Sequence, residues 1–431
     1  RGIALNSPLS KLFEIHILMT HIDVLATTDM QFGFKRRSST TQCTFVLLEA
    51  IQYYLHRDSS VFCMLLDASQ AFDNVQYIAL FRRLIDKHLC HRTCRVLLAM
   101  HTGQAVSVRW GSTTSTSFVV RNGVKQGGIL SPVLFTLYLD MLLDAIKGCG
   151  VGCHMGRTFV GAVAYADDVA ILAPTRSALK KMLSVAESAG AAIKVKFNPS
   201  KSQLLLFSPS LCSGQTPPIT FLGSEIPVSK ESVHLGHYIG CDRSAPPKLS
   251  GNDLTRRANI LMSRFGHCTM DVKYRLFRTH CMAVYGSNLW CMSQAEPFFC
   301  AWRKCLRRLL HLPRNTHCRL LPPLVQDLGP EEQLHRRLLR FLQASSSSPN
   351  VLVCRSMQEV IRGSGSAVSD SLTILCAKYN LVRSALPKNL TRPRNAMDLD
   401  VDASRLRDFI LLRERTRDRD IDFIIHYLAT F

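Results

Sequence analysis

The chain alternates between two hydrophobic periods. Continuous apolar runs, typical of buried strands, occupy residues 61–66, 159–164 and 169–172. Apolar residues spaced three or four positions apart predict helices, which we expect at residues 9–25, 40–56, 77–85, 131–142 and 177–189. Strand and helix patterns therefore share the first half of the chain.

Shorter segments predict hairpins between these elements. We expect one hairpin from residues 106–110 and 117–121, and another at 235–240. Residues 194–197 and 204–207 are expected as two edge strands, joined by the turn Asn198-Pro199-Ser200. Together the patterns predict an α+β fold with a small antiparallel sheet backed by helices.

From Arg256 onward the pattern is helical and basic. Residues 256–343 hold 15 Lys and Arg against 5 Asp and Glu, including Arg303, Lys304, Arg307 and Arg308. For any single arginine a solvated helix face is an equally good explanation. The serine run 345–348 with Pro349 predicts a linker, and residues 404–428 predict an exposed helix with alternating charges.

Two adjacent carboxylates are the first candidate chemistry. Tyr165-Ala166-Asp167-Asp168 lies between two apolar runs, so the acids are expected at a bend between two buried strands. Burying a charge costs several kcal/mol, and neighbouring carboxylates repel each other. A divalent cation is the simplest compensation. An ordinary Asp-Asp turn is the alternative.

A third acid makes the metal hypothesis more specific. Asp67 follows the apolar run 61–66 and precedes a helical pattern, so the strands are expected to bring three carboxylates to one edge of a sheet. Nucleotidyl transfer by two Mg²⁺ ions needs this arrangement, because carboxylates bridge both ions. The alternative is that Asp67 is only a helix N-cap.

The residues between these acids carry a further motif. Residues 122–135 form a glycine-rich loop that leads into a helix, with Ser131 as the expected N-cap and Pro132 at the first helical position. With Gln31-Phe32-Gly33-Phe34-Lys35-Arg36-Arg37 upstream, and motifs at 201–207, 234–240 and 284–290 downstream, the ordered set resembles a reverse transcriptase of the non-LTR (LINE-like) retrotransposon type. The resemblance covers about residues 1–310.

The resemblance implies a right-hand polymerase. Fingers and palm would span residues 1–243, a basic helical thumb 244–344, and a linker with a C-terminal helical region 345–431. The implied reaction is RNA-directed DNA synthesis from dNTPs, with two Mg²⁺ ions or with Mn²⁺. Its implied partners are a template RNA and a DNA primer, which pair to form an RNA–DNA duplex. A catalytically retired RNA-binding protein, a group II intron maturase-like enzyme and a telomerase-like enzyme are the alternatives.

The resemblance also assigns roles to individual residues. Asp67, Asp167 and Asp168 would hold the metal ions, and Lys201 would assist pyrophosphate departure, unless it is a strand-edge lysine kept for solubility. Phe72 would exclude a ribose 2′-hydroxyl, the alternative being a core phenylalanine. Further nucleotide contacts are expected from Gln126, Gly127, Lys11 and Arg37, and template or primer contacts from Tyr165, Ala166, Leu235, Gly236, Lys35 and Arg36.

Composition fits a nucleic-acid partner. The formal charge is +21 over 431 residues, which favours a polyanion because cations placed on phosphates release counterions. The longest apolar runs are too short to span a bilayer, so no membrane partner is expected. The 16 cysteines show no disulfide or standard zinc spacing and are expected as reduced thiols. The family suggests nucleus and cytoplasm, and the missing initiator Met indicates a fragment.

Overall fold

The computed structural model describes residues 3–69, 72–209, 218–240, 251–379 and 381. The chain divides into two compact units. One comprises Arg1–Leu235, Ile239–Cys241 and Asn350–Ser356; the other comprises Gly236–Tyr238, Asp242–Pro349 and Met357–Phe431. The expected division into fingers and palm, thumb and C-terminal region stays a prediction.

The first unit contains the sheet. Its helices are α1 (Pro8–Thr20), α2 (Thr40–Leu55), α3 (Tyr77–Asp86), α4 (His91–His101), α5 (Ser131–Gly148) and α6 (Arg176–Ala192). Its strands are β1 (Val61–Leu66), β2 (Ala68–Ser69), β3 (Ala105–Val106), β4 (Arg109–Trp110), β5 (Thr113–Thr114), β6 (Phe118–Val119), β7 (His154–Met155), β8 (Thr158–Phe159), β9 (Ala162–Tyr165), β10 (Asp168–Ala173), β11 (Lys196–Phe197), β12 (Gln203–Phe207), β13 (Ile219–Phe221), β14 (Ser224–Ile226), β15 (Val228–Ser229) and β16 (Glu231–His234).

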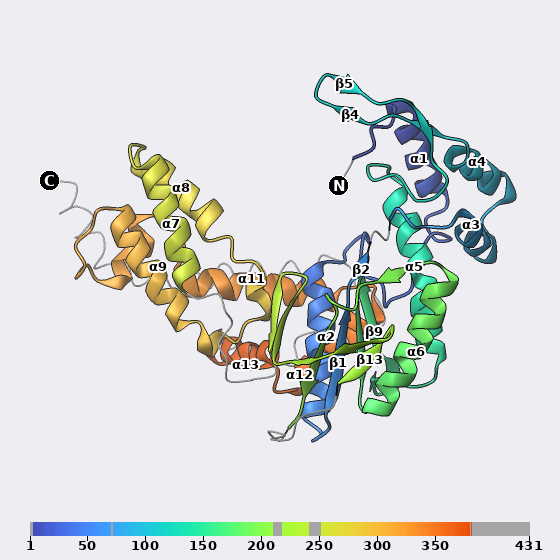
Figure 1. The fold of residues 1–431 in the computed structure, drawn as a ribbon. Coiled ribbons are helices and arrows are strands. Elements are labelled where there is room, and N and C mark those ends of the chain that lie inside the picture. Colours follow the sequence, from blue (N-terminus) through green and yellow to red (C-terminus); the bar gives the residue numbers. More distant parts are fainter. Residues whose placement is uncertain (1–2, 70–71, 210–217, 241–250, 380, 382–431) are drawn as a thin grey trace. The chain divides into compact units, whose positions relative to one another are not determined.

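Five strands form the main sheet, in the order β15-β12-β1-β10-β9. The pairs of β1 with β10, β1 with β12, and β10 with β9 are antiparallel, and only β15 adds in parallel. Figure 1 shows the strands between α2 on one side and α5 and α6 on the other. Nearly every residue of β1, β9 and β10 is buried, because helices cover both faces. The predicted α+β class with an antiparallel sheet is confirmed.

Two sequence expectations about this unit were wrong. β12 was expected at an edge, yet it lies inside the sheet, because the short strand β15 pairs with its outer side. Ser131 was expected to cap α5, but it is the first helical residue, and the N-cap position is Leu130. The hairpin between residues 106–110 and 117–121 is confirmed, with Val106 opposite Phe118.

The described part of the second unit is mostly helical. It contains α7 (Gly251–Phe265), α8 (Met270–Leu276), the π-helix η1 (Phe277–Cys281), the 3-10 helices η2 (Ser287–Leu289), η3 (Met292–Gln294) and η4 (Cys318–Leu320), and α9 (Glu296–Leu309), α10 (Leu321–Leu324), α11 (Pro330–Ser346) and α13 (Ala367–Tyr379). Both units share α12 (Val351–Arg362), and β17 (His237–Gly240) pairs with β16. The apolar stripe of α9 is buried around Trp302.

The linker expected from residue 345 begins as helix in the structure. Ser345 and Ser346 close α11 and are buried, so the helix continues through the first half of the serine run. The helix expected at residues 404–428 lies outside the described residues. No described helix combines the length and hydrophobicity that crossing a membrane requires.

Candidate functional site

The acidic turn joins strands β9 and β10. Their register pairs Tyr165 with Asp168, so Ala166 and Asp167 are the two central residues of a tight hairpin. Ala166 has a φ of 53°. This left-handed conformation costs an alanine about 1–2 kcal/mol, so surrounding contacts must hold it. The predicted hairpin is confirmed, and its turn carries Asp167 at the end of the sheet.

Asp67 follows the central strand of the same sheet. In the antiparallel pair of β1 and β10, Leu66 lies opposite Val169. Continuing this register by one residue sets Asp67 opposite Asp168. The sheet therefore brings the backbone of both acidic motifs together at one end, as the sequence predicted.

The turn that carries Lys201 is bound to the backbone of Asp67. The Asn198 N–H donates a hydrogen bond of 2.8 Å to the Asp67 carbonyl oxygen, and the Asp67 N–H donates to the Ser202 hydroxyl at 3.4 Å. Lys201 is exposed within this turn. Its position next to Asp67 is consistent with a role at the leaving group, which stays a prediction.

The three acids lie partly buried at the end of the sheet. Asp67, Asp167 and Asp168 are each half-buried. Burial, and next to it the charge of Asp168, raises the pKa of the buried Cys43 thiol near the start of α2. The Asp168 carboxylate is therefore close enough to the start of α2 to influence a thiol there, and its looser role as the third acid stays a prediction.

A shared ion site at these acids stays a prediction. Within the part of the chain that the structure describes, no three His, Cys, Asp or Glu side chains are grouped so that they could hold a metal ion. Carboxylate oxygens are nevertheless the donors that Mg²⁺ prefers. The donor type and the shared sheet end thus fit such an ion, and the residues that would hold it are Asp67 and Asp167, with Asp168 beside them.

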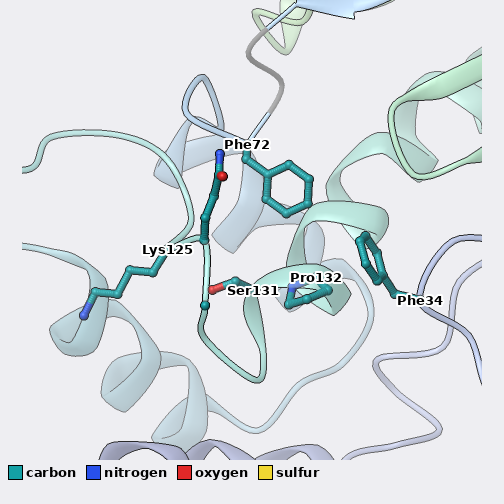
Figure 2. Close-up of a pocket in the computed structure, with 7 residues that line it drawn as sticks. Phe34, Phe72, Lys125, Ser131 and Pro132 are labelled. Atoms are coloured by element: carbon teal, nitrogen blue, oxygen red, sulfur yellow. The ribbon is translucent and has the colours of Figure 1, made fainter. Parts of the chain in front are cut away.

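A cavity of about 210 Å³ lies beside the glycine-rich loop. Figure 2 shows the side chains of Phe34, Phe72 and Pro132 around this space, with Lys125 extending away from the two rings. The seven lining residues are Phe34, Phe72, Lys125, Gln126, Gly127, Ser131 and Pro132. Three residues that were expected to contact the nucleotide, Phe72, Gln126 and Gly127, therefore share one cavity, whereas Lys11 and Arg37 are not among its lining residues.

Phe72 is held by two other aromatic rings. It stacks on Phe135 of α5, with ring centroids 4.1 Å apart and planes at 18°, and meets Phe34 edge-on at 6.2 Å. Phe135 is fully buried, whereas Phe72 is only half-buried. A half-buried ring that is anchored on one face and lines a cavity fits the predicted steric gate better than a core position.

Glu14 shapes the loop that lines the cavity. Its buried carboxylate accepts backbone hydrogen bonds from Ile129 at 2.5 Å and Leu130 at 3.1 Å. A carboxylate at the start of a helix also complements the helix dipole. Glu14, on α1, thus fixes the two residues that lead into α5, whereas the N-cap residue Leu130 makes no side-chain capping hydrogen bond.

The N-terminal segment also packs on this loop. The Ala4 N–H donates to the Gln126 carbonyl oxygen at 2.7 Å. A Cβ atom at Gly127 would come within 2.5 Å of the Ala4 carbonyl oxygen, and Gly127 has a φ of 125°. Only glycine fits here, because both the conformation and the close approach exclude a side chain.

Lys35 differs from the other two basic residues of its turn. Its ammonium donates to the carbonyl oxygens of Thr27 at 3.2 Å and Thr28 at 2.7 Å. Burial lowers the pKa of Lys35, although the charges of Asp29 and Asp140 oppose this shift. The ammonium therefore binds the protein itself, and this contradicts the expected phosphate contact. Arg36 and Arg37 are exposed and remain the candidates for phosphate.

The expected primer-binding turn is a tight hairpin. Leu235 and Gly236 join β16 and β17, with φ angles of 51° and 74°. Two successive positive φ angles are typical of a type I′ turn. The Gly236 backbone leaves room for the Tyr285 ring, because a Cβ atom here would lie 3.0 Å from it. A contact of Leu235 or Gly236 with the primer stays a prediction.

The basic residues of α9 are partly occupied within their own unit. Arg307 donates to the Thr316 carbonyl oxygen at 2.7 and 3.0 Å, Arg308 donates to Asn259 at 2.9 Å, and Arg303 forms an ion pair with Glu296. Lys304 is exposed. The sequence showed the positive charge of this helix but not which cations have protein partners.

The comparisons with known proteins agree with the geometry. Residues 1–226 match the family described as "Reverse transcriptase (RNA-dependent DNA polymerase)". The chain is 27% identical over 315 residues to a "Probable RNA-directed DNA polymerase from transposon BS" of Drosophila melanogaster, covering 67% of this chain and 33% of that protein. It is 30% identical over 136 residues to the "Retrovirus-related Pol polyprotein from type-2 retrotransposable element R2DM" of the same organism, covering 32% of this chain and 13% of that protein.

A third relative and one solved structure complete the comparison. The type-1 retrotransposable element R2 polyprotein of Popillia japonica is 25% identical over 256 residues, covering 57% of this chain and 36% of that protein. The structure of telomerase from Candida tropicalis with a fragment of telomeric RNA aligns with a TM-score of 0.41 and 11% identity, over 93% of this chain and 57% of that chain. The chain spans about a third or less of the length of these curated relatives.

Proposed function

Because the chain belongs to the reverse transcriptase family, we propose that it is an RNA-directed DNA polymerase of the non-LTR retrotransposon type. The relatives named above are polymerases of such elements. The observation that carries the proposal is the register of the main sheet: it pairs Leu66 with Val169, so Asp67 and Asp168 are the next residues at the same end, beside the turn that holds Asp167. If Asp67 were only a helix cap and Asp167-Asp168 only an ordinary turn, the two motifs would not need to lie at the same end of the sheet.

In the proposed reaction a primer 3′-hydroxyl attacks the α-phosphate of a dNTP and pyrophosphate leaves. Bound Mg²⁺ would lower the pKa of the attacking hydroxyl and neutralise charge on the leaving group. Asp67 and Asp167 supply the carboxylate oxygens for this purpose. Asp168, next to Asp167, would be the third acid, with a looser role.

The cavity beside the glycine-rich loop is the proposed dNTP site. Phe72 lines this cavity and stacks on Phe135. A sugar that enters the cavity would therefore contact a ring that packing holds in place. Gln126, with its amide, and Gly127, with its bare backbone, also line the cavity. The proposed partners are a template RNA, a DNA primer and the RNA–DNA duplex that they form, with the exposed Arg36 and Arg37 on phosphates.

Primer extension by the purified chain tests the proposal. A DNA primer is annealed to matched RNA and DNA templates, and dNTP incorporation with Mg²⁺ is followed over time. We expect extension on the RNA template. Extension on DNA alone would refute the RNA-directed assignment, and duplex binding without extension on either template would identify a retired RNA-binding protein instead.

A further inference from the structure

The side chain of Gln31 forms hydrogen bonds with the turn between β9 and β10. Gln31 is fully buried, and its amide uses both of its polar atoms on the backbone of Ala166. The Gln31 Oε1 atom accepts from the Ala166 N–H at 2.9 Å, and the Nε2 atom donates to the Ala166 carbonyl oxygen at 3.3 Å. The same Oε1 atom also accepts from the Gly33 N–H at 2.8 Å.

These bonds act on the peptide groups that aim Asp167. The N–H of Ala166 belongs to the peptide bond that precedes it, and its carbonyl belongs to the peptide bond that joins it to Asp167. Fixing both groups determines φ and ψ of Ala166, which is held at a left-handed φ of 53°. Released from the amide, Ala166 would favour other conformations, and the Asp167 carboxylate would move with its backbone.

The segment around Gln31 is shaped to receive this turn. The Phe32 N–H donates to the Ala164 carbonyl oxygen and the Ala164 N–H donates to Met30, both at 2.8 Å, so the segment pairs with the outer side of β9. A Cβ atom at Gly33 would lie 2.4 Å from the Ala166 nitrogen. The backbone can approach the turn this closely only because residue 33 is glycine.

The segment is itself anchored to rigid parts of its unit. The buried carboxylate of Asp140, on α5, accepts from the Thr28 N–H at 2.6 Å and from the Thr28 hydroxyl at 2.8 Å. The Lys35 ammonium binds the carbonyl oxygens of the same stretch. Asn350, which caps the start of α12, donates to the Asp29 carbonyl oxygen at 2.8 Å.

We propose that Gln31 is a positioning residue for nucleotidyl transfer: its amide sets the orientation of Asp167 toward Asp67 by fixing both peptide groups of Ala166. The proposal rests on the proposed function, and it gives a role to a glutamine that carries no chemistry of its own. It predicts that losing the amide impairs the chemical step and the metal requirement, and leaves duplex binding intact.

The first test replaces the amide by an apolar side chain of similar length. Gln31→Met is compared with wild type and with Gln333→Met, which removes a buried glutamine that donates to a backbone carbonyl in the other unit. We measure thermal stability, duplex affinity, kcat and KM for the dNTP, and the Mg²⁺ concentration that gives half-maximal rate. For Gln31→Met we expect kcat to fall by about 10- to 100-fold, the cost of a displaced reacting group, with a raised Mg²⁺ requirement and unchanged duplex affinity.

A purely structural role gives a different result. Gln31→Met would then resemble Gln333→Met, with activity lost only in proportion to folded protein and with kcat per folded molecule and the Mg²⁺ requirement unchanged. This result would overturn the proposal. Inactive wild-type protein would instead refute the proposed polymerase function.

A second variant keeps the test valid if Gln31→Met does not fold. In Gln31→Glu a protonated carboxyl has the shape of the amide and donates to the Ala166 carbonyl oxygen, whereas the carboxylate cannot. We expect the kcat of Gln31→Glu relative to wild type to rise as the pH falls. A ratio that does not change with pH would contradict a requirement for both bonds to Ala166.

Discussion

At the residue scale, Phe72 illustrates how packing fixes a ring that lines the proposed nucleotide cavity. Its ring lies against Phe135 on one face, so it cannot move deeper into the protein. The half of the ring that remains exposed lines the proposed nucleotide cavity. In this proposal, a 2′-hydroxyl on the sugar would clash with the Phe72 ring, which cannot move away because it packs on Phe135.

Phe72→Ala is expected to weaken sugar discrimination. Removing the ring opens space for the 2′-hydroxyl, so the ratio of dNTP to rNTP incorporation should fall by about tenfold or more. Competition between the two substrates in single-nucleotide extension measures the ratio. Phe72→Tyr, which keeps the ring, should retain discrimination; an unchanged ratio in Phe72→Ala would leave Phe72 as a packing residue only.

The sequence identified the residues with evident chemistry but missed those that position them. Asp67 and the Asp167–Asp168 pair follow apolar runs, and this pattern is readable without a structure. Gln31 and Glu14 act on backbone groups more than a hundred residues away. No local pattern specifies such a partner, although a glutamine or glutamate surrounded by apolar residues is a weak signal for one.

At the element scale, the stretch 27–37 has one inward and two outward cations. Lys35 binds two backbone carbonyls, and Asp29 and Asp140 lie close enough to oppose the lowering of its pKa. Arg36 and Arg37 are exposed. Charge alone predicted the same role for all three residues, because the sequence does not show which side chains point inward.

Lys35→Met is expected to change the stability of the fold, whereas Arg36→Met is expected to change the salt dependence of duplex binding. Lys35→Met loses two charge-assisted hydrogen bonds, so the free energy of unfolding should fall by about 1–3 kcal/mol with an unchanged salt dependence of duplex binding. Arg36→Met should keep its stability and reduce the salt slope by about one. Denaturant unfolding and binding titrations check both. A reduced salt slope with full stability in Lys35→Met would restore its phosphate role.

A buried histidine links the hairpin element to pH. His237 is buried, packs against the Tyr285 ring at a centroid distance of 4.8 Å, and has a pKa lowered by burial to about 4. Between that value and its ordinary value of 6.5, the unfolded chain binds more protons than the folded one. The contribution of His237 to stability is therefore complete above pH 6.5 and is lost as the pH falls toward 4.

His237→Phe is expected to flatten this dependence. The phenyl ring keeps the contact with Tyr285 and does not titrate, so the stability lost between pH 6.5 and 4 should shrink by on the order of 2 kcal/mol relative to wild type. Thermal unfolding at a series of pH values measures the difference. Parallel curves for the two proteins would show that His237 does not contribute.

Secondary-structure elements were predicted best where the hydrophobic periodicity was strong. They were predicted worst where their bounds or strand partners depended on residues outside the local pattern. The helix expected at 40–56 is α2, and the acidic hairpin has the expected strands. β12 was misplaced at an edge, because the strand that covers it, β15, is only two residues long and is too short to be recognised from its sequence pattern. The start of α5 was misplaced by one residue, because Ser131 is already helical and Leu130 holds the N-cap position.

At the scale of the whole molecule, the charge of +21 predicts strong and salt-dependent binding to polyanions. Each phosphate contact releases condensed counterions, so a plot of log affinity against log salt should have a slope more negative than about −4. Lys304→Gln, at an exposed cation, should reduce the slope by about one. Arg307→Gln should mainly lower stability, because its guanidinium is bound to Thr316. A slope near zero would contradict electrostatic binding.

The central claim is that Asp167 holds a metal ion for nucleotidyl transfer, and Asp167→Asn tests it most directly. Primer extension on an RNA template and duplex affinity are measured for this variant, for wild type and for Asp86→Asn, which changes an exposed acid at the end of α3. We expect extension by Asp167→Asn to fall by about a thousandfold or more, with duplex affinity unchanged and Asp86→Asn fully active. Extension by Asp167→Asn at the wild-type rate would contradict the account.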